Sequence, residues 1–348
     1  MKEIIFLFVV FFLQICNIEA SESLWNLDVK ELGIFDLEYN NTISIKNICP
    51  SVKIVELDKQ VSLCNPLYFI NVTSENTSRG YNYNFGNYTE IIIHYKSSQN
   101  KVLPDTDAIF QLFDYPEKNI FLKLRFSIPI FTNWISPLYN AHLNLNLKKP
   151  RVLNVPIDND LQSMYYSVKL DGLTKGTSVY VSSIYESDNY SSQGLVVGFL
   201  ENILWKTGIE YSNKKISGIA GINGRLLTRD SQPHGVIETI FSPVLSIGFY
   251  DDWKDGMEDY AKAVESVMEY KPKKLNESIT GWDSWAMAID QLGMPNISDL
   301  KSASKVLYNL KQKGFGDKQY ISRDAIYDLN TTQTENWVNY VNKNDQKS

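Results

Sequence analysis

The sequence has 348 residues and a formal net charge of −6 at pH 7, with 43% hydrophobic and 21% charged residues. This composition is close to ordinary globular usage, which excludes a chain that is disordered throughout or collagen-like, and the length suggests about two domains. The acidic balance, without any polybasic run, argues against nucleic acid or an anionic membrane surface as the main partner.

The first 20 residues have the pattern of a cleaved secretory signal peptide. Lys2 precedes a short apolar run over residues 4–13, and Ala20 is the small residue expected before a cleavage site. The run is shorter than the roughly 20 apolar residues that a membrane-spanning helix needs, and no later segment reaches that length. We therefore expect a secreted or lysosomal chain that begins near residue 21 and has no membrane span.

Cysteine usage fits an oxidising compartment. Cys16 leaves with the signal peptide, so the mature chain keeps Cys49 and Cys64. Two lone cysteines are expected to pair there, closing a loop of about 15 residues. No metal site is indicated, because the three histidines are scattered without ligand spacing, and no cofactor is indicated either.

Asn-x-Ser/Thr sequons are frequent and mark candidate N-glycosylation sites on a secreted chain. The eight sequons begin at Asn40, Asn71, Asn76, Asn87, Asn189, Asn276, Asn296 and Asn330. They agree with secretion but carry no information on mechanism.

From about residue 24 to residue 250 the dominant pattern is the two-residue period of β-strands. It is clearest over residues 120–128, where apolar residues alternate with Lys123, Arg125 and Ser127. The stretch 73–87, rich in Asn, Ser, Tyr and Gly, is expected to be a mobile loop. Further strands are expected over residues 91–95, 142–147, 165–170, 178–185, 195–200 and 237–249. Short strands without an intervening helical pattern predict an antiparallel β-sandwich over residues 21–250.

The period changes at Asp252. Apolar residues from Trp253 to Met268 recur at helical intervals, which predicts a connecting helix within residues 251–274.

The remaining residues, 275–348, alternate between strand and helix. A short strand over 280–285 precedes a helix over 298–314 that starts at an N-cap Ser298 and ends at Gly314. A second strand over 320–323 precedes a helix opened by the capping box of Thr332 and Glu335. This order is the beginning of a parallel α/β arrangement that is too short to be complete.

Three segments carry a family resemblance. They are residues 247–261, the run Gly281-Trp282-Asp283-Ser284-Trp285, and the run Tyr320-Ile321-Ser322-Arg323-Asp324. In this order they resemble the exit from the sandwich, the first barrel strand and the second barrel strand of the α-galactosidase-like glycoside hydrolases. That family carries a β-sandwich ahead of a (β/α)8 barrel. The resemblance implies a mainly β chain in which the sandwich is followed by an incomplete, TIM-barrel-like segment.

The resemblance also implies sugar-binding roles for Trp285, Asp324 and Asp283. An indole face packs on the apolar face of a sugar ring, while a carboxylate at the C-terminal rim of a barrel accepts hydrogen bonds from hydroxyls. Asp283 replaces the Asn that the family has there, and Ala325 stands where many members have a second acidic residue. Taken singly, Trp285 also fits a core aromatic at a strand end, and Asp324 a solvated acid.

Retaining glycoside hydrolysis needs two carboxyl groups across the scissile bond. In the resembling family both lie on later barrel strands, and residues 275–348 supply only about two of the βα units of a barrel. No catalytic residue can therefore be named. We expect the N-terminal portion of an α-galactosidase-like hydrolase, truncated early in the barrel, that is inactive alone but able to bind an α-galactoside-like carbohydrate. The alternative is a secreted, non-catalytic β-sandwich glycoprotein that binds carbohydrate or a surface partner.

Overall fold

The computed structural model divides into two compact units, Met1–Tyr270 and Lys271–Ser348, and each is described by itself. The structure describes residues 23–55, 59–98, 103–114, 117–155, 166–170, 175–187, 192–202, 205–221, 237–268, 279–283, 297–314, 318–322, 331–344 and 346. The predicted signal peptide over residues 1–20 lies outside these ranges. The domain boundaries predicted at residues 250 and 274 stay predictions.

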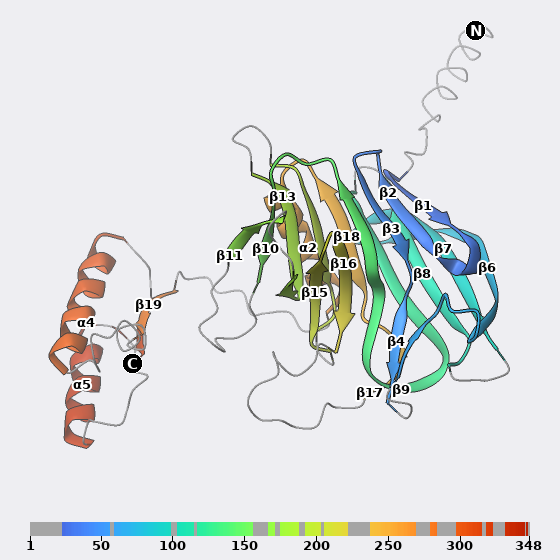
Figure 1. Cartoon of the computed structure of the whole chain (residues 1–348). Helices are drawn as coiled ribbons and strands as arrows, with labels where there is room; N and C mark the ends of the chain where they lie inside the picture. The colour runs from blue at the N-terminus through green and yellow to red at the C-terminus, as the bar shows by residue number, and fades with distance from the viewer. Residues whose placement is uncertain are drawn as a thin grey trace, which may run out of the picture. The chain divides into compact units, whose positions relative to one another are not determined.

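The first unit consists of β-strands followed by one long helix (Figure 1). The strands are β1 (Trp25–Val29), β2 (Phe35–Tyr39), β3 (Ile43–Ile48), β4 (Ser51–Ile54), β5 (Lys59–Ser62), β6 (Phe69–Asn82), β7 (Gly86–Ser97), β8 (Thr106–Phe113), β9 (Asn119–Leu145), β10 (Pro150–Asn154), β11 (Tyr166–Lys169), β12 (Lys175–Val179), β13 (Val181–Glu186), β14 (Gly194–Phe199), β15 (Thr207–Ser212), β16 (Lys215–Ala220), β17 (Ile237–Phe241) and β18 (Leu245–Tyr250). A 3-10 turn, η1 (Glu31–Gly33), follows β1, and the helix α2 (Trp253–Val267) follows β18.

The strands form two antiparallel layers that share β9. The first part of β9 pairs with β8 on one edge and with β18 on the other, and β14, β13, β10 and β11 extend that layer beyond β18. The last part of β9 pairs with β4 and β3 on one edge and with β16 on the other. β15 and β12 extend this second layer beyond β16. The predicted antiparallel sandwich is therefore confirmed.

The core lies between the two layers, as the alternation in β9 predicts. Ile120, Leu122, Leu124 and Phe126 are fully or almost fully buried, whereas the intervening Arg125 is exposed. Their partners in the same hydrophobic cluster come from both layers and include Leu37, Ile45, Ile184, Val197 and Ile247. Burial of apolar side chains from both sides is the main favourable term in the stability of such a sandwich.

Two predicted strand boundaries were wrong because the chain changes partners there. The strand expected over 178–185 is broken at Tyr180, whose φ of 62° lies in the left-handed region. It separates β12, which pairs with β15, from β13, which pairs with β10 and β14. The strand expected over 237–249 is likewise two strands, β17 and β18, interrupted at Pro243, which has no N–H to donate.

The strands expected over 120–128 and 142–147 are parts of one 27-residue strand, β9. Pro129 lies within it and marks the place where pairing on one edge is interrupted, as discussed below. A local pattern cannot show that both halves belong to one strand, because the two halves have different neighbours.

The loop expected over 73–87 is wrong. β6 and β7 form a long hairpin that pairs as far as Asn82 and Gly86. Gly80 is required there, because a Cβ at this position would collide with the ring of Tyr88 on the opposite strand. Pairing along the whole hairpin, and onward from β7 to β8, outweighs the weak strand propensity of Asn, Ser and Gly.

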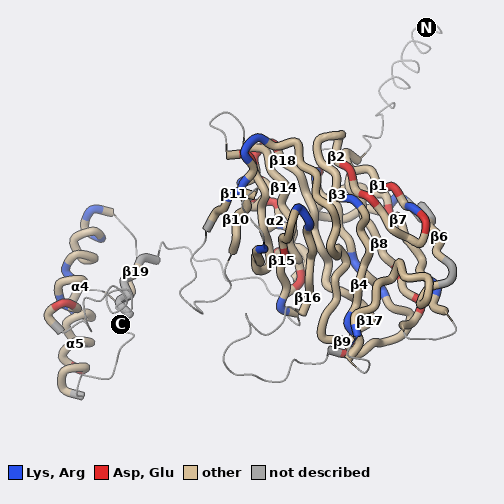
Figure 2. Tube along the Cα trace, viewed as in Figure 1, with Lys and Arg blue, Asp and Glu red and all other residues tan. Residues whose placement is uncertain are grey.

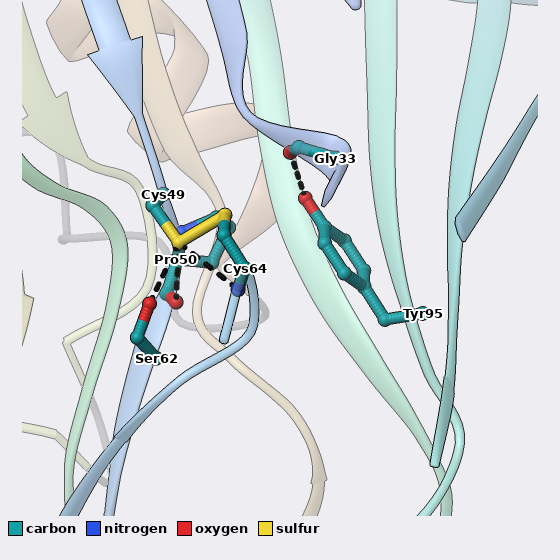
Figure 3. Close-up of a disulfide and its surroundings, with 6 residues drawn as sticks. All are labelled: Gly33, Cys49, Pro50, Ser62, Cys64 and Tyr95. Atoms are coloured by element: carbon teal, nitrogen blue, oxygen red, sulfur yellow. Dashed lines mark hydrogen bonds between the residues drawn. A yellow bond between two sulfur atoms is a disulfide. The ribbon is translucent and has the colours of Figure 1, made fainter. Parts of the chain in front are cut away.

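The predicted disulfide between Cys49 and Cys64 is present, with 5.9 Å between the Cα atoms (Figure 3). It closes the β4–β5 hairpin at its base, because Cys49 lies just before β4 and Cys64 lies just after β5. The Ser62 hydroxyl and the Cys64 N–H lie 2.8 and 3.1 Å from the Cys49 sulfur.

The predicted glycosylation sites lie partly within the described residues. Asn40 and Asn87 are exposed, and Asn71 and Asn76 lie on β6. Asn189, Asn276, Asn296 and Asn330 lie outside the described residues. None of the helices in the described part of the chain combines the length and the apolarity that a membrane crossing requires. Figure 2 shows acidic and basic residues interspersed along the strands, with no large region of one sign among the described residues.

Candidate functional site

In the second unit the described residues form two strands and two helices in alternation. They are β19 (Ile279–Asp283), α4 (Ile297–Gln312), β20 (Lys318–Ser322) and α5 (Thr331–Lys343). β19 and β20 pair in parallel, from Ile279 opposite Lys318 to Asp283 opposite Ser322. A helix between two parallel neighbours is the unit from which α/β barrels are built, so the predicted opening of an α/β segment is confirmed.

The two helices pack on each other and hold this unit together. Leu300 of α4 and Trp337 and Val341 of α5 are buried, with Leu307 and Tyr340 packed beside them. The buried Ser304 hydroxyl donates to Gln346 Oε1 at 2.5 Å, and Gln346 Nε2 donates back to the Ser304 carbonyl at 2.9 Å. These bonds fix the chain after α5 against α4.

The helix ends predicted from the sequence agree with those of the structure to within one or two residues. α4 begins at Ile297, so Ser298 lies in the first turn and not at the N-cap, and α5 begins at Thr331, one residue before the expected cap. Gly314 has a φ of 82° and donates its N–H to the Lys311 carbonyl. Such a left-handed residue after a helix is the C-terminal stop that glycine provides.

The carboxyl ends of β19 and β20 lie at one edge of the parallel pair, because Asp283 and Ser322 are opposite each other. Gly281 allows this pairing: a Cβ there would lie 2.9 Å from the Tyr320 carbonyl oxygen. Of the predicted sugar-binding residues, only Asp283 lies on a described strand, and its side chain is not described. Trp285 and Asp324 lie outside the described residues; in sequence each follows one of these two strand ends by two residues.

Two half-buried carboxyl groups of the sandwich, Glu117 and Glu210, are alternative candidates for an acid. Burial raises the pKa of Glu117, and Asp259 raises it further while Lys262 opposes the shift. Burial also raises the pKa of Glu210, and Lys175 opposes that shift. Glu117 thus faces α2, whereas Glu210 faces β12, so the two are in different surroundings and do not form the carboxyl pair of a hydrolase.

His94 is part of a polar cluster that crosses three strands of the first layer. Its Nδ1 lies 2.7 Å from Asp107 Oδ1, and Arg125 donates to the other oxygen of Asp107 at 2.6 and 3.0 Å. The three residues are direct cross-strand neighbours on β7, β8 and β9, an arrangement that stabilises a sheet. Among the described residues, no group of His, Cys, Asp and Glu has the arrangement of a metal site.

Sequence analysis did not identify a cleft of about 410 Å³ in the sandwich. It is lined by residues 127–131 and, among others, by Ile54, Ser97 and Asp105. The one signal for it in the sequence is Pro129 inside a strand pattern, since proline within a sheet is confined to edges and irregularities.

Comparison with known proteins rests on structure alone. No family model matches the sequence, and no curated protein matches it. The chain is similar to the crystal structure of a beta-arabinopyranosidase, with a TM-score of 0.55 and 9% identity over 94% of this chain and 54% of that one. It is also similar to the alpha-N-acetylgalactosaminidase NagBb from Bifidobacterium bifidum in complex with GalNAc, with a TM-score of 0.54 and 9% identity over 94% of this chain and 57% of that one.

The chain therefore spans little more than half the length of these solved structures. Identities this low show a shared fold and nothing finer. The described fold of this chain, a sandwich followed by alternating strands and helices, is thus similar to the fold of these two glycosidase structures.

Proposed function

We propose that this chain is the N-terminal portion of a secreted or lysosomal α-galactosidase-like glycoside hydrolase. The observation that carries the proposal is the parallel pairing of β19 with β20, which follows the antiparallel sandwich and the helix α2 in the order of that family. The similarity to two glycosidase structures over 94% of the chain supports it.

In this proposal the carboxyl ends of β19 and β20 supply one side of a sugar subsite. Trp285 stacks on the apolar face of the sugar ring, and Asp324 and Asp283 accept hydrogen bonds from its hydroxyls. Sites in barrels lie at the C-terminal ends of their strands, and Asp283 and Ser322 end the two strands at the same edge.

Hydrolysis itself needs a nucleophilic carboxylate and an acid/base carboxyl about 5 Å apart, which later barrel strands supply in the resembling family. The chain on its own is therefore proposed to bind an α-galactoside-like sugar weakly and not to cleave it. A longer protein that includes those strands would carry out the reaction with retention of configuration.

The test combines an assay and a binding measurement on the purified chain. Chromogenic α-galactosides should not be turned over, while titration with galactose, followed by NMR, should show weak binding that Trp285→Ala and Asp324→Asn each weaken. Asp299→Asn, on the first turn of α4, is the matched control and should leave binding unchanged. Hydrolysis that disappears in Asp324→Asn, or galactose binding that neither variant changes, would contradict the proposal.

Sequencing of the transcript beyond the codon for Ser348 gives an independent test. Further βα units with an acidic residue at the end of a later strand are expected. A stop codon directly after Ser348 would favour the alternative, a secreted β-sandwich glycoprotein that binds carbohydrate without catalysis.

A further inference from the structure

On the edge of β9 that faces β8 and β4, pairing with described strands is interrupted between these two strands. Pairing with β8 ends at Phe126 opposite Thr106, and pairing with β4 begins at Thr132 opposite Ile54. Over residues 127–131, where β9 passes from one layer to the other, the described residues include no strand on this edge. On the opposite edge β17 pairs with β9 over Ile130–Thr132 and again at Arg125, with an irregularity of register between these points.

A cleft of about 410 Å³ opens at this gap in pairing. Ile54 from the end of β4, Ser97 from the end of β7 and Asp105 from the start of β8 line it, together with residues 127–131 of β9. The volume lies within the range of about 300–1,000 Å³ that small-molecule sites have.

The apolar part of the cleft is accessible. Ile128 is 61% exposed and Phe131 is 47% exposed, although both lie within a strand of a buried sandwich. Pro104 and Pro129 also line the cleft and restrict the backbone there. A half-exposed aromatic ring at the side of a rigid cleft offers a flat apolar surface to a ligand.

The polar part of the cleft consists mainly of acceptors. Asp105 is exposed, and its Oδ1 is held in place by the Ser97 N–H at 2.8 Å. The Ser127 N–H is already bonded to the Asp105 carbonyl, and the Phe131 carbonyl accepts from Val55 N–H. Pro129 lies between these two residues in the chain and has a carbonyl but no N–H.

Among the described residues that line the cleft, none is Lys, Arg or His. Anionic ligands such as phosphate are therefore disfavoured beside Asp105. An additional protein strand is disfavoured as well, since the gap spans only residues 127–131, is closed at both ends by backbone bonds, and has no donor at Pro129.

We propose that this cleft binds a neutral saccharide unit, with one face of the sugar ring on Phe131 and Ile128 and its hydroxyls donating to Asp105 and to the strand carbonyls. Sugars match the cleft because they combine many hydroxyl donors with an apolar face. The site belongs to the sandwich and does not depend on the proposed sugar subsite at the ends of β19 and β20.

The test uses the full chain and a panel of neutral sugars: galactose, arabinose, glucose, mannose, N-acetylgalactosamine and lactose, with inorganic phosphate as the anionic probe. Saturation-transfer NMR identifies the binders, and NMR titration gives their dissociation constants. Phe131→Ala and Asp105→Asn should each weaken the best binder roughly tenfold, because each removes one of the two principal contacts. Asp105→Asn retains an oxygen that can accept from Ser97 N–H.

Phe241→Ala is the matched control, since Phe241 is also a partly exposed phenylalanine but does not line the cleft, and it should change binding less than twofold. Failure of every sugar to saturate would overturn the proposal, as would binding that neither Phe131→Ala nor Asp105→Asn weakens. Saturation by phosphate with no sugar binding would also overturn it. Sugar binding lost only in Asp324→Asn would assign all binding to the barrel-type subsite. If Phe131→Ala fails to fold, Asp105→Asn decides the outcome.

Discussion

The contact between Tyr95 and Gly33 shows how single residues connect the two layers. Tyr95 of β7 is buried, and its hydroxyl donates to the Gly33 carbonyl at 2.6 Å (Figure 3). Gly33 has a φ of 72°, and a Cβ at this position would lie 2.5 Å from the Tyr95 ring. Only glycine meets both requirements, since it alone adopts this φ freely and leaves space for the ring.

Burial raises the pKa of Tyr95 above its ordinary value of 10.0, and it is also the largest cause of the raised pKa values of Tyr211, Tyr250 and Tyr260. In the folded protein these phenols stay protonated above pH 10, whereas in the unfolded chain they lose their protons. The unfolded state then binds fewer protons, so the free energy of unfolding falls as pH rises.

We therefore expect stability to be independent of these groups below pH 10 and to decrease above it. Each buried tyrosine contributes at most about 1.4 kcal/mol per pH unit. Urea unfolding at intervals between pH 8 and pH 11 measures the slope. Tyr95→Phe should reduce the slope, and Tyr83→Phe, which changes a 90% exposed tyrosine, should not. An equal slope in all three proteins would contradict the expectation.

At the scale of elements, α2 illustrates how a helix is started and attached. Asp252 is its N-cap, and the carboxylate accepts the Lys254 N–H at 3.0 Å. The helix contacts β14 and β18 of the first layer, and the Tyr260 hydroxyl donates to the Phe199 carbonyl at 2.6 Å. Gly256 faces the ring of Tyr250, which leaves no room for a side chain. The helix predicted from its apolar period is thus confirmed.

The two adjacent aspartates before α2 should differ in their contribution to stability. Asp252→Ala should lower the free energy of unfolding by about 1 kcal/mol, because it removes the N-cap acceptor. Asp251→Ala should lower it by less than about 0.5 kcal/mol, because the Asp251 side chain is 81% exposed and its ion pair with Lys118 is screened by water. Urea unfolding of both variants at pH 7 checks this, and equal losses would show that the cap is not the stabilising contact.

At the scale of the whole molecule, the two units differ in how their strands are supported. β14 has partners on both edges, β13 and β18, and both of its faces are buried. In the described part of the second unit, β19 and β20 have only each other. A two-stranded ribbon is marginal in water and depends on the helices that cover it.

Hydrogen exchange should therefore separate the units. We expect backbone amides of β19 and β20 to exchange at least about tenfold faster than those of β14 in the native chain, because local opening costs less where fewer partners are lost. Mass spectrometry of peptides covering residues 194–199, 279–283 and 318–322 gives the comparison. Equal protection would mean that the second unit is stabilised as strongly as the sandwich.

Features that depend on residues close together in the chain could be predicted from the sequence alone. The alternation around Leu122 and Leu124 predicted a strand with one buried face, and the period after Asp252 predicted a helix. The two cysteines outside the predicted signal peptide, Cys49 and Cys64, were predicted to pair. The runs that begin at Gly281 and Tyr320 indicated the order of the second unit, but the placement of Trp285 and Asp324 as a site stays a prediction.

How these elements combine could be learned only from the three-dimensional structure. The union of two predicted strands in β9, the break at Tyr180, the hairpin of β6 and β7 and the cleft beside Phe131 all depend on pairing between residues far apart in the chain. The physical reason is that a side-chain period reports which face of a segment is buried, and not which strand lies beside it. Strand partners are chosen by the packing of whole layers. The cleft lies where β9 passes from one layer to the other and where no described strand pairs with one of its edges.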